Sequence, residues 1–182
     1  GSVALFLESI LRAAGRRTAL LLSPHGTRLT ERWQINGVPM DEKTFVRIIG
    51  TLKPALNAYA AEHPEDPLSF FELAAAIGFL HFAKQSADWA VIEVGMGGRY
   101  DATNAIHKKD IAVITNIGRD HLDAIGPALA DVAREKAGIV SRGCAVFTAE
   151  TRPRLQSIFR KKAKKKRARM EILSVMHKTL AA

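Results

Sequence analysis

The stretch that most limits how this chain can fold runs from residue 91 to residue 104 and reads V-I-E-V-G-M-G-G-R-Y-D-A-T-N. A β-branched apolar run carries a carboxylate, Glu93, and passes directly into a loop with three glycines, Gly95, Gly97 and Gly98. This pattern predicts a buried strand that ends in a ligand-facing turn, because glycine lets a backbone come close to a bound group. An ordinary glycine-rich turn explains the glycines equally well, but an acid in an apolar strand end needs a partner that offsets its desolvation.

Strand and helix patterns alternate along the rest of the chain, and the predicted strands are apolar throughout. This alternation predicts an α/β fold with a mostly parallel sheet covered by helices on both faces. The length of 182 residues allows one sizeable core, so one domain is the default expectation. Strands are predicted at residues 18–22, 89–94, 111–114, 144–148 and 170–175, and helices at residues 3–14, 42–62, 73–87, 128–137 and 152–167.

Capping and turn residues indicate several boundaries. Asp41 is in position to cap the helix that follows it, and Pro54 must kink or divide that helix. Ser69 and Glu72 have the spacing of a capping box ahead of the alanine-rich helix. The pair Asn36-Gly37 lies between apolar residues and predicts a small hairpin.

The net charge of +9 is concentrated in one part of the chain. From Arg152 onward eleven basic residues are opposed by Glu171 alone, which gives this tail a charge of +10 and leaves −1 for residues 1–151. The basic run at residues 161–169 allows a function of a different class, that of a non-catalytic protein contacting nucleic-acid phosphates. A solvated helix surface explains the same run, and it is the interpretation we favour over nucleic acid as a partner.

Two further features concern the cellular environment. No apolar run reaches the length of a membrane-spanning helix, so we expect no membrane partner. The single cysteine, Cys144, excludes an internal disulfide framework and favours a reducing compartment. We therefore expect a cytoplasmic protein.

Polar groups follow three of the predicted strands. They are Ser23, Glu93 and the pair Asp120-His121. Because the carboxyl ends of parallel strands lie at one edge of a sheet, residues far apart in the sequence can meet there and bind a metal ion or a phosphate. Each has an ordinary alternative, since Ser23 precedes a proline as turn residues do, and the pair can cap backbone amides of its loop. Lys136 follows a glutamate on a predicted helix, a position that usually faces water.

Several segments together resemble the folylpolyglutamate synthase/dihydrofolate synthase family of Mur-type ligases. Three of them read E-V-G-M-G-G-R-Y-D-A-T-N at residues 93–104, I-T-N-I-G-R-D-H-L-D at 114–123 and R-E-K-A-G-I at 134–139. Shorter ones, S-P-H at 23–25, E-R-W-Q-I-N-G at 31–37 and S-F-F-E at 69–72, are similar to other segments of that family in the same order. The resemblance covers residues 1–150 and is much weaker across the basic tail.

The resemblance implies an ATP-dependent ligase that adds L-glutamate to a folate or dihydropteroate. In such enzymes ATP phosphorylates a carboxylate to an acyl phosphate, which the amino group of glutamate then attacks. Because a polyanion must accept a carboxylate nucleophile, metal ions and cationic groups must neutralise both. The implied cofactors are ATP and Mg²⁺, and the implied full-length enzyme is a monomer of folate metabolism. A muramyl-peptide ligase of the same superfamily is the close alternative.

The resemblance also assigns roles to residues of the predicted metal centre. It implies that Ser2, Ser23, Glu93 and His121 bind Mg²⁺, with His121 also counted among the catalytic residues. Lys136 matches the family's carbamylated lysine, whose modification turns a cation into a carboxylate-like group. This implication reverses the expectation that Lys136 is solvated.

The substrate side of the resemblance involves two segments. Asp101, Ala102 and Thr103 would approach the pteroate part of the substrate, and Phe70 would line the same pocket. For Phe70 a buried aromatic beneath the capping box is an equally good interpretation.

The chain departs from the family at both ends. The family's P-loop has the form G-x-x-G-K-G-S, and here Gly1 and Ser2 match only its last two positions, unless they are a remnant of cloning. We favour the motif, although the phosphate-binding lysine is absent. The expected organisation is a partial ATPase domain at residues 1–150, a basic helix with a final strand or tail of the same domain at 151–182, and no C-terminal domain. Such a fragment is expected to be inactive alone.

Overall fold

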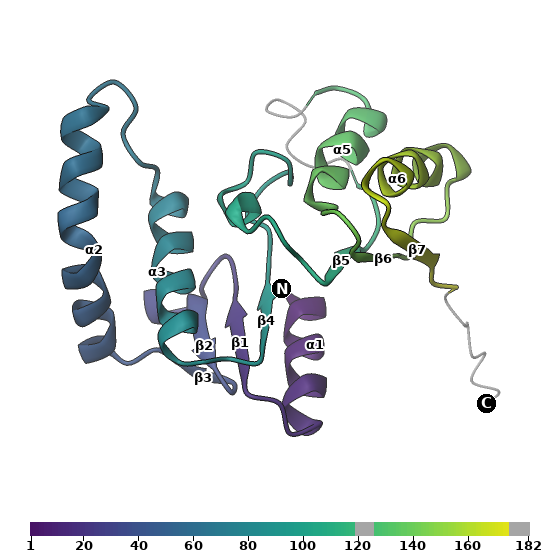
Figure 1. Cartoon of the computed structure of the whole chain (residues 1–182). Coiled ribbons are helices and arrows are strands. Elements are labelled where there is room, and N and C mark those ends of the chain that lie inside the picture. Colours follow the sequence, from purple (N-terminus) through teal and green to yellow (C-terminus); the bar gives the residue numbers. More distant parts are fainter. Residues whose placement is uncertain (119–125, 175–182) are drawn as a thin grey trace. The chain divides into compact units, whose positions relative to one another are not determined.

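The computed structural model describes residues 1–118 and 126–174 (Figure 1). Where length alone predicts one domain, the contacts group the residues into two compact units, Gly1–Gly95 and Met96–Ala182. Each unit has a sheet and a hydrophobic core of its own. Together they confirm the predicted α/β class.

The first unit contains a four-stranded sheet in the order β3-β2-β1-β4. Strand β1 (Thr18–Leu21) pairs in parallel with β4 (Trp89–Ile92), and it pairs antiparallel with β2 (Trp33–Ile35). Strand β3 (Val38–Pro39) completes the predicted hairpin with β2. Asn36 and Gly37 have φ angles of 51° and 75°, the left-handed backbone that a two-residue hairpin turn requires.

Helices cover both faces of this first sheet. Helix α1 (Ser2–Ala13) packs on one face, and α3 (Phe70–Lys84) packs on the other, with α2 (Glu42–Glu62) outside α3 (Figure 1). All four residues of β1 are buried, as expected for a strand covered on both sides. The core on the α3 side consists of Ala19, Leu21, Trp33, Met40, Ile48, Ala74, Ile77 and Phe82.

The predicted helix caps are present. The Asp41 side chain accepts a hydrogen bond from the backbone N–H of Thr44 at 2.8 Å, and Ser69 and Glu72 form both bonds of the capping box. Pro54 lies inside α2, which continues undivided to Glu62. Of the two effects predicted for Pro54, division of the helix is therefore wrong, and a kink stays a prediction.

The second unit contains a parallel three-stranded sheet in the order β5-β6-β7. Its strands are β5 (Ile111–Ile114), β6 (Ala145–Thr148) and β7 (Arg169–Ile172). Helices α5 (Leu129–Lys136) and α6 (Pro153–Lys166) pack against each other and share one core with the sheet. Val132, Val146 and Phe159 are at most 1% exposed in this core.

The basic tail is an integral part of the second unit. Helix α6 buries Leu155, Phe159 and Ala163, so its basic residues occupy the remaining, mostly exposed positions. This is the arrangement expected of a solvated surface helix. Among the helices in the described ranges, none is long and apolar enough to cross a membrane.

Candidate functional site

The carboxyl ends of β1 and β4 bring two of the predicted site residues together. Parallel pairing in register places Leu21 opposite Ile92, so Ser23 and Glu93 follow neighbouring strand ends. The backbone N–H of Ser23 donates to Oε2 of Glu93 at 2.9 Å. The amino group of Gly1 donates to the other oxygen of Glu93, which places the N-terminal end of α1, with Ser2 as its first residue, beside the carboxylate.

The oxygen atoms of Glu93 and Ser23 are suitable ligands for a hard cation. Carboxylate and hydroxyl oxygens are the protein ligands that Mg²⁺ prefers. The Glu93 side chain is 19% exposed, and the hydroxyl of Ser23 forms no hydrogen bond with another described residue. Within residues 1–118 and 126–174 no three His, Cys, Asp or Glu side chains form a metal-binding group. Asp120 and His121 lie outside the described residues.

The glycines after β4 make room for protein atoms. A Cβ on Gly95 would lie 2.5 Å from the ring of Phe71, and a Cβ on Gly97 would lie 2.9 Å from the Glu135 side chain. A Cβ on Gly98 would lie 2.9 Å from the carbonyl oxygen of Glu135. Real Cβ atoms do not approach so closely, so close packing within the protein accounts for all three glycines. The ligand-facing role predicted for them is not needed to explain their positions.

Glu135 holds the glycine loop against the end of α5. Its carbonyl oxygen accepts from the N–H of Arg99 at 3.0 Å, and its side chain accepts from the N–H of Tyr100 at 3.2 Å. Lys136, the next residue, is half-buried rather than fully solvated. The carbamylation implied for Lys136 stays a prediction.

Asp101 closes the loop that was predicted to approach a pteroate group. One of its oxygens accepts from the N–H and the hydroxyl of Thr103, and the other accepts from the N–H of Met96 at 2.9 Å. Thr103 is only 3% exposed and lies in the 3-10 turn η2 (Ala102–Ala105), which begins with the half-buried Ala102. In this unit the visible role of Asp101 and Thr103 is therefore to fix the loop, and a substrate contact stays a prediction.

Phe70 has a partner that the sequence did not predict. The residue is 57% exposed, so the alternative of a buried aromatic is wrong. The guanidinium of Arg32 lies 5.2 Å from the ring centroid, and Nε of Arg32 donates to Nδ1 of His25 at 3.0 Å. The quoted segments S-P-H, E-R-W-Q-I-N-G and S-F-F-E contain all three residues, but spacing alone could not show that they meet.

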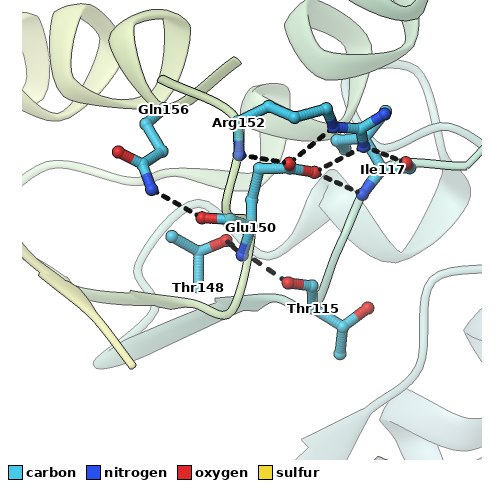
Figure 2. A network of polar contacts seen from close by, with 6 residues as sticks. All are labelled: Thr115, Ile117, Thr148, Glu150, Arg152 and Gln156. Atoms are coloured by element: carbon cyan, nitrogen blue, oxygen red, sulfur yellow. Dashed lines mark hydrogen bonds and ion pairs between the residues drawn. The ribbon is translucent and has the colours of Figure 1, made fainter. Parts of the chain in front are cut away.

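A second unpredicted feature is a buried carboxylate at the end of β6. Figure 2 shows Glu150 between Arg152 and the backbone of Ile117, which follows β5. Glu150 accepts from the Ile117 N–H at 2.9 Å and from Nε and Nη2 of Arg152 at 2.7 Å each, while Arg152 also donates to the Ile117 carbonyl. The bond from Arg152 is the main reason that the pKa of Glu150 falls to about 2. The pair thus ties together the carboxyl ends of β5 and β6.

Taken together, a carboxylate and a hydroxyl group at the carboxyl ends of parallel strands, beside a helix N-terminus, define an α/β fold whose strand-end edge has an arrangement typical of phosphate-binding proteins. Residues 41–179 match the model of the Mur ligase middle domain, and the chain belongs to this family.

Comparison with known proteins confirms the resemblance to folylpolyglutamate synthases. The dihydrofolate synthase/folylpolyglutamate synthase of Bacillus subtilis is 33% identical over 95% of this chain, which spans 40% of that protein. The folylpolyglutamate synthase of Mycobacterium tuberculosis, solved with ADP and AMPPCP, is 34% identical over 94% of this chain and 40% of its own, with a TM-score of 0.88. A structure described as an FPGS–AMPPCP–folate complex is 29% identical, covers 94% of this chain and 42% of its own, and also has a TM-score of 0.88.

Proposed function

We propose that the protein carrying this chain is an ATP-dependent ligase that adds L-glutamate to a folate or dihydropteroate carboxylate through an acyl phosphate. The observation that carries the proposal is the meeting of Ser23 and Glu93 at adjacent strand ends, beside the start of α1. Support comes from similar structures whose descriptions include ATP analogues and folate. Since the chain spans 40% of its Bacillus subtilis relative, the activity is proposed for the whole protein.

The chemistry of the proposed reaction explains why these residues suit it. A carboxylate must attack the terminal phosphate of ATP, so two anions have to approach each other. Mg²⁺, when bound, supplies the charge that makes this approach possible. Glu93 and Ser23 offer it oxygen atoms, with Ser2 and His121 as the further ligands we propose. The first backbone N–H groups of α1 suit a phosphate, because a helix N-terminus carries partial positive charge.

The remaining parts of the proposal concern Lys136 and the cellular setting. Carbamylation would give Lys136 a carboxylate-like group, whose oxygens could also serve Mg²⁺. Asp101, Ala102 and Thr103 are proposed to face the pteroate part through the loop that they close. The full-length enzyme is proposed to be a monomer located in the cytoplasm. The single buried Cys144 supports the location, because a free cysteine is typical of a reducing compartment.

The test uses a full-length protein that contains this chain. We expect glutamate-dependent ADP release with dihydropteroate or tetrahydrofolate, and none with a muramyl-peptide precursor. Glu93→Gln should lower the turnover and raise the Mg²⁺ concentration required, because an amide does not replace the negative charge of a carboxylate toward a cation. The exposed Glu65→Gln in the same unit is the matched control and should leave both unchanged. Absence of folate-dependent ADP release would refute the proposal.

The 182-residue chain itself gives a separate prediction. We expect no ligase turnover from it, because it spans only 40% of the length of its Bacillus subtilis relative. Folate-dependent ADP release from the purified chain would show that this reasoning is wrong.

A further inference from the structure

Three basic segments of the second unit meet at the amino-terminal edge of its parallel sheet. The starts of β5, β6 and β7 are paired in register, so the residues that precede these strands lie at one edge. Lys109, Arg142 and Lys166 each lie two or three residues before one of these starts. The N–H of Gly143 donates to the carbonyl oxygen of Lys166 at 3.0 Å, and the Ser141 hydroxyl bonds to both backbone groups of Lys109. These bonds tie the turn before β6 to both neighbouring segments.

Four basic side chains line an open hollow at this edge. The hollow has a volume of about 380 Å³, and the residues that line it are Arg142, Lys165, Lys166 and Arg167. Lys166 is half-buried and the other three are exposed. None of the four side chains forms a hydrogen bond or an ion pair with another residue that the structure describes. Among the five residues before each strand only Asp110 is acidic, so the edge carries a large excess of positive charge.

This charge exceeds what the end of α6 itself requires. A helix C-terminus carries about half an elementary negative charge, which a single lysine in the last turn offsets. The hollow has four cations, and Lys162 lies one turn earlier on the same helix. Burial lowers the pKa of Lys162, and the charges of Lys166 and Arg99 lower it further. The cations therefore repel one another, and an anion bound among them would relieve this repulsion.

The fold does not require the guanidinium of Arg167. This residue ends α6 with a φ of 51° and a ψ of 35°, the left-handed region that glycine adopts most readily. Its N–H and that of Ala168 close the helix end by donating to the carbonyl oxygens of Lys164 and Ala163 at 3.1 and 2.9 Å. A glycine would form the same bonds without the steric cost of a side chain in this conformation. Arg167 thus adds a cation to the hollow at some cost to the turn.

We propose that Arg142, Lys165, Lys166 and Arg167 bind an oligophosphate, a compact anion with several phosphate groups. An anion with three or more negative charges matches four cations around one hollow. Each guanidinium can donate two parallel hydrogen bonds to one phosphate group, and the lysines add point charges. No aromatic ring is among the described residues that line the hollow, so the phosphate chain is what the site would recognise. The site goes beyond the proposed ligase reaction, since it lies at the strand edge opposite the carboxyl ends.

The test compares a chain of phosphate groups with a single one. The 182-residue chain is titrated with inorganic tripolyphosphate and with inorganic phosphate, at fixed ionic strength and without Mg²⁺. Binding is followed by NMR at the backbone N–H groups of Gly143 and Ala168. We expect tripolyphosphate to bind at least about tenfold more tightly than phosphate, and Arg142→Gln to weaken tripolyphosphate binding about tenfold, because a charged hydrogen-bond donor is lost.

Arg167→Gly separates loss of the site from loss of the fold. Glycine suits the backbone at this position, so the urea concentration at the midpoint of unfolding should not fall. Binding of tripolyphosphate should nevertheless weaken about tenfold. If Arg142→Gln unfolds the second unit, Arg167→Gly decides the question. A stable Arg167→Gly variant that binds tripolyphosphate as tightly as the wild type would overturn the proposal.

A matched control separates the hollow from general attraction of an anion to α6. Arg160 is exposed on the same helix and does not line the hollow, so Arg160→Gln removes the same charge. We expect it to change the affinity for tripolyphosphate by less than about twofold, as is usual for an exposed charge that makes no direct contact. Equal effects of Arg160→Gln and Arg142→Gln, or equal affinities for phosphate and tripolyphosphate, would contradict the assignment.

Two further titrations identify the source of the phosphate groups. ATP that binds as tightly as tripolyphosphate would assign the site to a phosphate chain alone, and ATP that binds at least about tenfold more tightly would assign it to the triphosphate of a nucleotide. Either result supports an oligophosphate site. A single-stranded RNA that shifts the same N–H groups while tripolyphosphate does not would overturn the proposal and assign the edge to nucleic acid.

Discussion

Replacing Glu150 by glutamine should destabilise the second unit selectively. Glu150 is 1% exposed, and its two oxygens accept hydrogen bonds from Arg152 and Ile117. Lowering its pKa from 4.5 to about 2 corresponds to about 3 kcal/mol of stability at neutral pH. The Arg152 side chain is 44% exposed, so solvent screens part of this attraction, and we expect a loss of about 2 kcal/mol.

The assay uses the single cysteine as a reporter of the second unit. Cys144 is 1% exposed and lies in the core of that unit, whereas both tryptophans, Trp33 and Trp89, lie in the first. Labelling of Cys144 with a pyridyl disulfide, which reacts in acid as well as at neutral pH, requires opening of the core. A loss of about 2 kcal/mol should speed this labelling about 30-fold at pH 7. Unfolding followed by tryptophan fluorescence should stay as in the wild type.

The stabilisation by Glu150 should depend on pH, and its direction follows from the pKa shift. The folded pKa of Glu150 lies below its unfolded value, so the stabilisation is fully present above pH 4.5 and is lost as the pH falls toward 2. The difference between Glu150→Gln and the wild type should therefore shrink to less than half near pH 3. Glu171→Gln, at an exposed position of β7, is the control and should leave labelling unchanged. Equal effects of the two variants, or a difference that persists at low pH, would refute the electrostatic reasoning.

Three other substitutions test the packing and the caps through the free energy of unfolding in urea. Phe159→Ala removes a 0% exposed ring from the second core and should cost about 3–5 kcal/mol. Asp41→Ala removes the cap bond to Thr44 and should cost about 1 kcal/mol, which Asp41→Asn should largely restore. Gly138→Ala places a Cβ 2.4 Å from the Cα of Arg99, so a backbone shift costing about 1–3 kcal/mol is expected, while the exposed Gly50→Ala meets nothing within 4 Å.

Elements whose signals are local could be predicted from the sequence. The Asp41 cap, the Ser69 capping box and the Asn36-Gly37 turn each depend on residues within a few positions of one another. Strand positions followed from short apolar runs bounded by turn residues. Pro54 shows the limit of local reasoning, because tertiary packing of α2 against α3 can retain a helix despite one lost backbone hydrogen bond.

Features that depend on pairing between distant residues could not be predicted. Glu150 accepts a hydrogen bond from Ile117, which is 33 residues away in the sequence, and nothing in either segment indicates the partner. The contact of Arg32 with Phe70 likewise depends on how the 3-10 turn η1 (Leu29–Arg32) and α3 approach each other. The meeting of Ser23 and Glu93 was predictable, because parallel pairing places the carboxyl ends of neighbouring strands at one edge.

The number of hydrogen bonds that a carboxylate already accepts shows whether it can also bind a ligand. A carboxylate can accept about four hydrogen bonds. Glu150 accepts four, from Ile117 and Arg152, and this leaves it no room for a metal ion. Glu93 accepts one bond on each oxygen, so it retains the capacity that a cation requires. Of these two carboxylates, Glu93 is therefore the one whose hydrogen bonds leave room for the proposed Mg²⁺.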